Sequence, residues 1–158
     1  MRDLRSIVDR VEIEALRGEF TDAGMTHDHD RFAALFTEDG VWRIPAAGIE
    51  FTSRAAIRAG RERLHGGWEF FVQTIHPGII QFDGDPAREA PGGARPSNTA
   101  SGRSYVAELG RLRDGGSHQN YAVYHDRYRR TPDGWRFTER VYQVRYLDTT
   151  PLAGSAPT

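Results

Sequence analysis

The fold is decided by the stretch NYAVYHDRYRRTPDGWRFTERVYQVRYL, residues 120–147. Aromatic and β-branched residues alternate with polar ones in both halves, which is typical of half-buried strands. Between the halves, TPDG at residues 131–134 carries the chemistry of a tight turn. We therefore expect an antiparallel hairpin in which Tyr124, Asp126 and Tyr128 share one face of the first strand.

Three helices are expected ahead of that hairpin. Apolar residues recur every three to five positions over residues 4–23, which predicts a long helix. Asp28 or Asp30 could cap a short second helix, because a side-chain oxygen there can accept from a free backbone N–H. Ser53 fits the same role for a third helix over residues 54–64, which should end at the glycines that follow.

The rest of the chain has the composition of strands and loops. Residues 41–44, 70–82 and 103–111 have the apolar content of strands. Residues 37–40 have turn chemistry, and residues 86–101 are rich in Pro, Gly, Ala and Ser, which favours a loop. The expected helices precede most of the expected strands along the chain, and this order predicts an α+β fold. We expect a cone-shaped, curved, mixed or antiparallel β-sheet wrapped around a pocket and covered by three N-terminal helices.

Length and composition limit the organisation of the chain. Its 158 residues suit one domain, which we assign to residues 1–148, with a draped or disordered tail over residues 149–158. There is no Cys, and all 21 basic residues are Arg. These absences exclude disulfides, thiol nucleophiles, zinc held by Cys, Schiff bases on Lys and a Walker-type phosphate loop.

Charge and hydropathy favour a small-molecule substrate over other partners. The net charge is −1, so nothing favours binding to nucleic acid. No apolar run approaches the ~18 residues of a membrane span, so no membrane contact is expected. The charged start of the chain lacks a signal-peptide pattern, and the expected location is the cytoplasm. His27 and His29 would face different sides of a helix, so no metal site is expected.

The order of these features resembles the nuclear transport factor 2-like superfamily, in its SnoaL-like branch. The resemblance is carried by residues 13–16 and 30–42, by His76 after an apolar strand, and by residues 126–137 and 139–140. Within that branch the chain is similar to scytalone dehydratase, polyketide cyclases and hexachlorocyclohexane dehydrochlorinase. The resemblance implies a cystatin-like α+β barrel that works without a cofactor and assembles as a homodimer or homotrimer.

The resemblance also implies a catalytic pair. Enzymes of this branch use a His–Asp dyad in a cone-shaped pocket to remove a proton. Their His matches His76, and an imidazole suits proton transfer at neutral pH. Their Asp aligns with Met25, whose thioether cannot orient an imidazole. Asp28, about one helical turn further on, or Asp126 in the hairpin would then supply the carboxylate.

Arg140 and Tyr124 are the candidates for stabilising negative charge. Arg140 matches the pocket Arg of the dehydrochlorinase and could hold an enolate or a leaving group, while Tyr124 could donate a hydrogen bond. Strict alternation puts Arg140 on the face opposite Phe137, unless a bulge shifts the register. The competing explanations are structural: a hydrogen-bonded His76, an outward-facing Asp126 and a surface ion pair for Arg140.

A mostly aromatic set of residues is expected to bind the substrate. Its members are Phe20, Met25, Trp42, Phe71, Thr74, Tyr105 and Tyr142. The predicted function is a cofactor-independent lyase, isomerase or cyclase that uses His76-centred acid/base chemistry on a small apolar cyclic or oxygenated molecule. Two non-enzymatic alternatives stay open. One is a small-molecule-binding or assembly module with a degenerate site, and the other is the small subunit of a ring-hydroxylating dioxygenase.

Overall fold

The computed structural model describes residues 4–83 and 97–156. These residues form three α-helices, a 3-10 turn and six strands. The helices are α1 (Leu4–Met25), α2 (His29–Ala34) and α3 (Arg54–Gly66), and the turn is η1 (Pro45–Ala47). The strands are β1 (Phe36–Ile44), β2 (Ile49–Thr52), β3 (Trp68–Phe82), β4 (Thr99–Leu112), β5 (Ser117–Thr131) and β6 (Gly134–Asp148).

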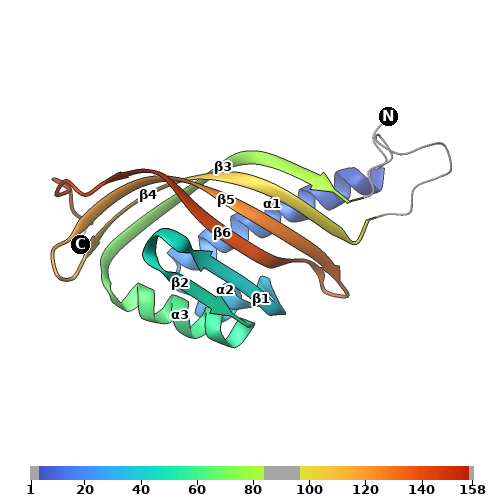
Figure 1. Ribbon diagram of the computed structural model, residues 1–158, viewed down its shortest axis with the longest axis horizontal. Helices are drawn as coiled ribbons and strands as arrows, with labels where there is room; N and C mark the ends of the chain where they lie inside the picture. Colours follow the sequence, from blue (N-terminus) through green and yellow to red (C-terminus); the bar gives the residue numbers. More distant parts are fainter. Residues whose placement is uncertain (1–3, 84–96, 157–158) are drawn as a thin grey trace.

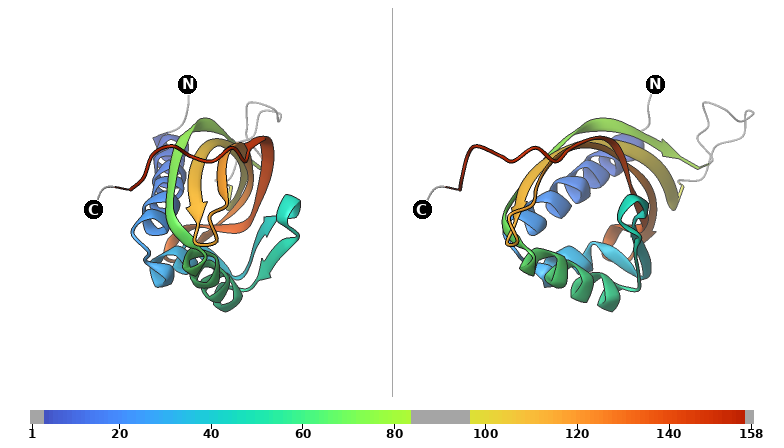
Figure 2. Two further views of the ribbon diagram at one scale, coloured as in Figure 1. Left: turned by 90° about the vertical axis from the view of Figure 1, so that its left-hand side faces the viewer. Right: turned by 60° about the vertical axis from the view of Figure 1, so that its left-hand side comes forward.

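The strands form one curved, unclosed sheet in the order β2-β1-β6-β5-β4-β3. Neighbouring strands are antiparallel except β1 and β6, which run parallel. The long strands bend around α1, which lies on the concave side, while α2 and α3 lie beside β1 and β2 (Figure 1, Figure 2). The predicted α+β fold, a cone-shaped mixed sheet covered by three N-terminal helices, is confirmed.

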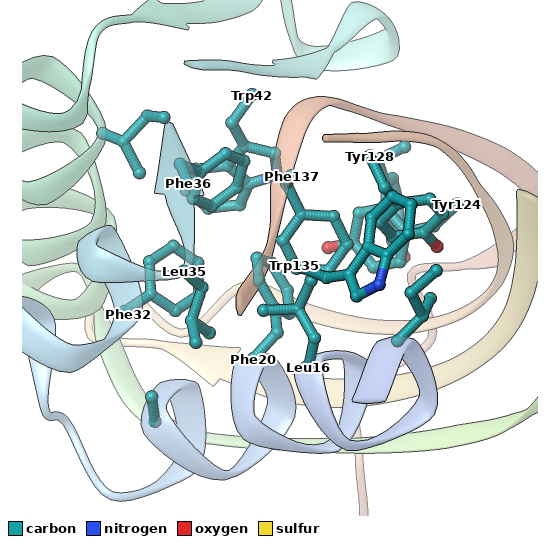
Figure 3. Packing of buried hydrophobic residues seen from close by; sticks show 14 of the residues in the cluster. Leu16, Phe20, Phe32, Leu35, Phe36, Trp42, Tyr124, Tyr128, Trp135 and Phe137 are labelled. Atoms are coloured by element: carbon teal, nitrogen blue, oxygen red, sulfur yellow. The ribbon is translucent and has the colours of Figure 1, made fainter. Parts of the chain in front are cut away.

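Aromatic side chains fill the space where α1 and α2 meet the inner face of the sheet. Leu16 and Phe20 on α1 point toward the aromatic residues of the sheet (Figure 3). The Phe20 ring centroid lies 4.4 Å from that of Phe32, 5.5 Å from that of Tyr124 and 5.9 Å from that of Phe137. Such tilted and edge-on pairs add to the gain from burial, so they hold α1 across the sheet.

The first turns of α1 lie outside this core. Leu4, Ile7, Val8 and Val11 share their apolar spacing with Leu16, yet they are between 45% and 75% exposed. Spacing predicted the helix correctly, but it is a local signal and burial depends on what packs against each turn. None of the described helices is both long and apolar enough to cross a membrane.

Local cap chemistry sets the helix starts as predicted. Of the two candidate caps for α2, Asp28 has the role, and its Oδ1 accepts a hydrogen bond from the backbone N of Arg31 at 3.0 Å. At α3, Ser53 Oγ accepts from the backbone N of Ala56 at 3.2 Å. Each cap satisfies a donor that the helix itself cannot.

Three features of the strands differ from the sequence prediction. Residues 37–40 belong to β1 and not to a turn, and the register with β6 shifts between Phe36 and Val41. Residues 99–101 belong to β4, whereas most of the predicted loop over 86–101 lies outside the described residues. Strand β2 was missed, because four residues are too few for a periodic signal.

The β5–β6 hairpin is confirmed, and it contains a register shift with a large consequence. Tyr128 pairs with Phe137, but Arg127 pairs with Glu139, so β6 has one extra residue at this point. Beyond this bulge the alternation is reversed, and Phe137 and Arg140 both point inward, where each is 0% exposed. Strict alternation is therefore wrong for Arg140.

The C-terminal tail is tied to the end of the sheet. Residues 149–156 form no helix or strand. Arg111 Nη2 donates to the carbonyl oxygens of Leu152 at 2.6 Å and Gly154 at 2.8 Å. The backbone N of Leu152 also donates to Ser117 Oγ at 3.3 Å, so the first part of the tail is anchored beside β4 and β5.

Candidate active site

A cavity of about 290 Å³ lies between the helices and the inner face of the sheet. An apolar cavity of ~150 Å³ can hold benzene, so this volume suits a molecule of one or two rings. Its aromatic lining consists of Phe20, Phe32, Trp42, Trp68, Phe71, Tyr124 and Tyr142. Its polar lining consists of Arg61, Gln73, Glu108, His118 and Asn120.

Glu108 is the carboxyl group of this cavity. Alternation along β4 turns it inward, and it is 8% exposed. Gln73 Nε2 donates to its Oε1 at 2.5 Å, and the Tyr142 hydroxyl donates to its Oε2 at 2.6 Å. The Gln73 amide is itself oriented by the Thr21 hydroxyl, which donates to Gln73 Oε1 at 2.9 Å. Side chains from α1, β3 and β6 thus fix one carboxyl group in the wall.

Burial raises the pKa of Glu108 above its ordinary value, because desolvation disfavours the carboxylate. The hydrogen bonds from Tyr142 and Gln73 and the positive charge of Arg61 act in the opposite direction but are smaller. A carboxyl group with a raised pKa keeps its proton to higher pH than an exposed one. It can therefore act as an acid as well as a base in proton transfer.

Tyr124 and Tyr142 supply hydroxyl groups beside Glu108. Their ring centroids lie 5.1 Å apart, and each residue is less than 5% exposed. Desolvation, with the negative charge of Glu108, raises the pKa of both phenols, so both remain protonated donors at neutral pH. The Tyr142 hydroxyl is committed to Glu108.

Arg61 brings a positive charge into the same wall from α3. It is 7% exposed, and its Nη2 donates to the carbonyl oxygen of Gly24 at 2.9 Å. Its guanidinium carbon lies 5.2 Å from the ring centroid of Phe32 and 5.4 Å from that of Phe71. Desolvation lowers the pKa of Arg61, but the group stays ionised at neutral pH because its ordinary pKa is so high.

His118 on β5 is the remaining titratable group of the lining. Its ring centroid lies 4.6 Å from that of Trp68. Desolvation lowers its pKa, so the imidazole is neutral at neutral pH. A neutral imidazole can accept or donate a proton, and His118 could therefore relay protons between the cavity and solvent.

A second buried polar cluster is centred on Asp126 and does not line the cavity. Arg140 Nε donates to Asp126 Oδ1 at 2.8 Å, and Arg140 Nη2 donates to Oδ2 at 3.1 Å. Tyr128 donates its hydroxyl to Asp126 Oδ2 at 2.7 Å, and Arg17 Nε donates to that hydroxyl at 2.8 Å. The Arg140 guanidinium carbon also lies 3.9 Å from the Tyr124 ring centroid. Arg140 and Asp126 therefore form a fully buried ion pair within the core.

The structure separates His76 from the residues expected to meet it. His76 pairs with Tyr105 on the outer face of the sheet and is exposed. It lines an outer hollow of about 450 Å³ with Tyr105 and His125, whereas the Asp126 and Arg140 side chains are buried on the inner side. The expected His76–carboxylate dyad is therefore not formed.

The other expected site residues divide between the cavity and the surface. Phe20, Trp42, Phe71, Tyr124 and Tyr142 line the cavity as expected. Thr74 and Tyr105 are exposed on the outer face, and the Asp28 carboxylate caps α2 and pairs with Arg31. Met25 lies beside β3, where the backbone N of Gln73 donates to its sulfur at 3.2 Å.

Met25, which the resemblance aligns with the dyad Asp, meets Gln73 on β3. The contact joins the Met25 sulfur to the backbone N of Gln73, while the Gln73 side chain bonds to Glu108 in the cavity wall. A thioether and an amide have no acid/base function near neutral pH. Sequence reasoning also missed Arg61, Glu108 and His118, although Val106-Ala107-Glu108 shows an acid two residues from an apolar strand position.

Solved structures share this fold over nearly the whole chain. A candidate aromatic ring hydroxylase from Novosphingobium aromaticivorans DSM is 25% identical, over 91% of this chain and 94% of that chain, with a TM-score of 0.77. A hexachlorocyclohexane dehydrochlorinase (LinA, type 2) is 22% identical, over 99% and 98%, with a TM-score of 0.80. A candidate scytalone dehydratase from Novosphingobium aromaticivorans DSM 12444 is 18% identical, over 96% and 94%, with a TM-score of 0.75.

The family follows from the sequence itself. No curated protein sequence matches the chain. The SnoaL-like domain family matches residues 5–141, which include α2, α3, strands β1 to β5, almost all of α1 and the first half of β6. The chain therefore belongs to the SnoaL-like domain family of the nuclear transport factor 2-like superfamily, whose fold it shares with proteins named as a dehydrochlorinase and a dehydratase.

Proposed function

We propose that the chain is a cofactor-independent lyase, isomerase or cyclase that acts on a small apolar cyclic or oxygenated molecule in the inner cavity. The observation that carries the proposal is Glu108, a carboxyl group with a raised pKa that faces an aromatic cavity while two donors hold its oxygens. The names of the dehydrochlorinase and dehydratase neighbours support the same general kind of chemistry.

In this proposal Glu108 moves the proton. Its carboxylate takes a proton from an acidic carbon of the substrate, and the electron pair left behind delocalises into a neighbouring carbonyl or expels a leaving group. The Tyr124 hydroxyl donates a hydrogen bond to the oxygen on which charge develops. Glu108 then returns the proton to a different atom or to the leaving group, which completes an isomerisation or an elimination.

The test is a hydrogen–deuterium exchange assay, because proton removal from carbon is common to elimination, isomerisation and cyclisation. One- and two-ring ketones are incubated in D₂O with the protein, and loss of the acidic C–H signal is followed by ¹H NMR. We expect catalysed exchange for some of these ketones and a loss of roughly 10²- to 10⁴-fold in the Glu108→Gln variant. Exchange that survives this substitution would reject Glu108 as the proton-transfer group.

Glu69→Gln is the matched control, because Glu69 is an exposed glutamate on the neighbouring strand β3. It should exchange substrate protons at the wild-type rate. Near-ultraviolet circular dichroism of all variants checks that the aromatic packing is unchanged. A similar loss in both variants would mean that the effect comes from altered charge and not from the cavity.

A binding module is the second candidate function. The observation that favours it is Met25, which lies against Gln73 at the position where the resemblance implies the dyad Asp. This candidate predicts that ring molecules bind in the cavity and that neither wild type nor Glu108→Gln exchanges their protons.

The dioxygenase small-subunit role stays a prediction, as does a homodimer or homotrimer. The small-subunit role predicts co-purification with a larger iron-containing chain. Light scattering of the purified protein measures its mass in solution and so tests for a homodimer or homotrimer. Exposed Val72, Ile79, Tyr105 and Tyr121 give the sheet an apolar surface that supports self-association.

A further inference from the structure

Arg61 is a buried cation for which the described part of the chain provides no ion-pair partner. Its side chain is only 7% exposed, yet it forms no ion pair with any residue in the described ranges 4–83 and 97–156. Its Nη2 bonds to the Gly24 carbonyl, while its Nε is buried without a hydrogen-bond partner. A buried charge is costly unless it is paired, so this arrangement is incomplete as it stands.

The surroundings of Arg61 do not supply the missing charge. The faces of Phe32 and Phe71 give a partial cation–π interaction only. Glu108 lines the same cavity, but it accepts from Gln73 and Tyr142 and forms no ion pair with Arg61. Its raised pKa also makes it a poor permanent counter-charge. The open space of about 290 Å³ lies against both groups.

We infer that the cavity takes a one- or two-ring molecule carrying a carboxylate, and that Arg61 binds this carboxylate while the rings contact the aromatic lining. A guanidinium presents parallel N–H donors in a planar fork that matches a carboxylate, and the unpartnered Nε is one of these donors. The inference deepens the proposed function, and it rests on that function only in treating the cavity as the substrate site.

Isothermal titration calorimetry with two matched probes tests the inference. Naphthalene-2-carboxylate and naphthalene-2-carboxamide have nearly the same shape, but only the first is an anion at pH 7. We expect the wild-type protein to bind the carboxylate roughly tenfold or more tightly than the amide. In Arg61→Met this preference should disappear. Arg63→Met is the control, because Arg63 is exposed on the same helix and should keep the preference.

Equal binding of the two probes by wild type, or a preference that survives in Arg61→Met, would overturn the inference. If Arg61→Met does not fold, the Nε–H signal of Arg61 in a ¹⁵N NMR spectrum of the wild type decides. It should move on addition of the carboxylate and stay in place with the amide, whereas no movement with either probe would contradict the inference.

Glu108→Gln separates this inference from the proposed function. It should retain the carboxylate preference while losing proton exchange. A preference that depends on Arg61, together with exchange that does not depend on Glu108, would leave the anion site in place and remove the catalytic proposal. Loss of the preference in Glu108→Gln would mean that Glu108, and not Arg61, selects the ligand, and this too would overturn the inference.

Discussion

Arg140 and Arg61 are both buried guanidinium groups in contact with aromatic rings, yet their electrostatic surroundings differ. Arg140 is paired through two hydrogen bonds with Asp126, and that carboxylate is also bonded by Tyr128. Arg61 has one carbonyl partner and borders an open cavity. The comparison teaches that a buried charge paired with an opposite charge serves the fold, and that a buried charge without an ion-pair partner among the described residues, beside a cavity, marks a place for a ligand.

The largest expected effect is on stability, and it tests the difference between Arg140 and Arg61 directly. Arg140→Met leaves Asp126 as an uncompensated buried charge, so we expect it to lower the free energy of unfolding by about 3–5 kcal/mol. Arg61→Met removes an unpaired charge and leaves an apolar side chain in its place, so we expect a loss of less than ~1 kcal/mol or a gain. Urea unfolding followed by tryptophan fluorescence measures both. Equal losses would mean that Arg61 is as structural as Arg140.

A smaller effect is expected in the pH dependence of stability. The pKa of Glu108 is raised in the folded state, so above its unfolded value the folded protein binds more protons than the unfolded chain. Its contribution is therefore fully present below the unfolded pKa and is lost as the pH rises through the folded pKa. Wild type should lose stability relative to Glu108→Gln by up to about 1.4 kcal/mol per pH unit in that window.

Denaturation midpoints at a series of pH values from acid to neutral measure this difference. Groups with lowered pKa, such as His118, have the opposite sign and destabilise the fold on the acid side, but they are present in both proteins and cancel. A difference between wild type and Glu108→Gln that stays constant with pH would contradict the raised pKa.

The smallest effect is expected at the outer face. His76→Ala should change the free energy of unfolding by less than about 0.5 kcal/mol, because the side chain is exposed, and it should leave proton exchange unchanged. The same exchange assay used for Glu108→Gln measures this. A loss of exchange in His76→Ala would mean that the active site lies in the outer hollow. The proposed ligand-binding role of Arg61 in the inner cavity would then be rejected.

Local signals were sufficient for much of the fold. The TPDG turn, the Ser53 and Asp28 caps and the apolar spacing of α1 each act within a few residues. The direction in which a strand residue points depends on β-bulges, and these arise from the pairing with a neighbouring strand that is distant in the sequence. Counting from Phe71 along β3 turns His76 outward, whereas counting back from Ile80 would turn it inward.

The β-bulge between Phe71 and Ile80 decides on which face of the sheet His76 lies, and few features of the sequence indicate this bulge. The register with β4 shifts between His76 and Ile79, where a Cβ on Gly78 would lie 1.8 Å from the carbonyl oxygen of Arg103. The second bulge, in β6, brings Arg140 inside in the same way. Glu108 and Arg61 were missed because they meet at one cavity only through the pairing of β3 with β4 and the packing of α3.

The most direct test of the central claim, that the inner cavity around Glu108 and Arg61 is the functional site, is a crystal structure with naphthalene-2-carboxylate bound. The account predicts the rings against the aromatic lining and a carboxylate oxygen ~2.7–3.2 Å from an Arg61 nitrogen. A probe found instead in the outer hollow beside His76, with the inner cavity empty, would contradict the account.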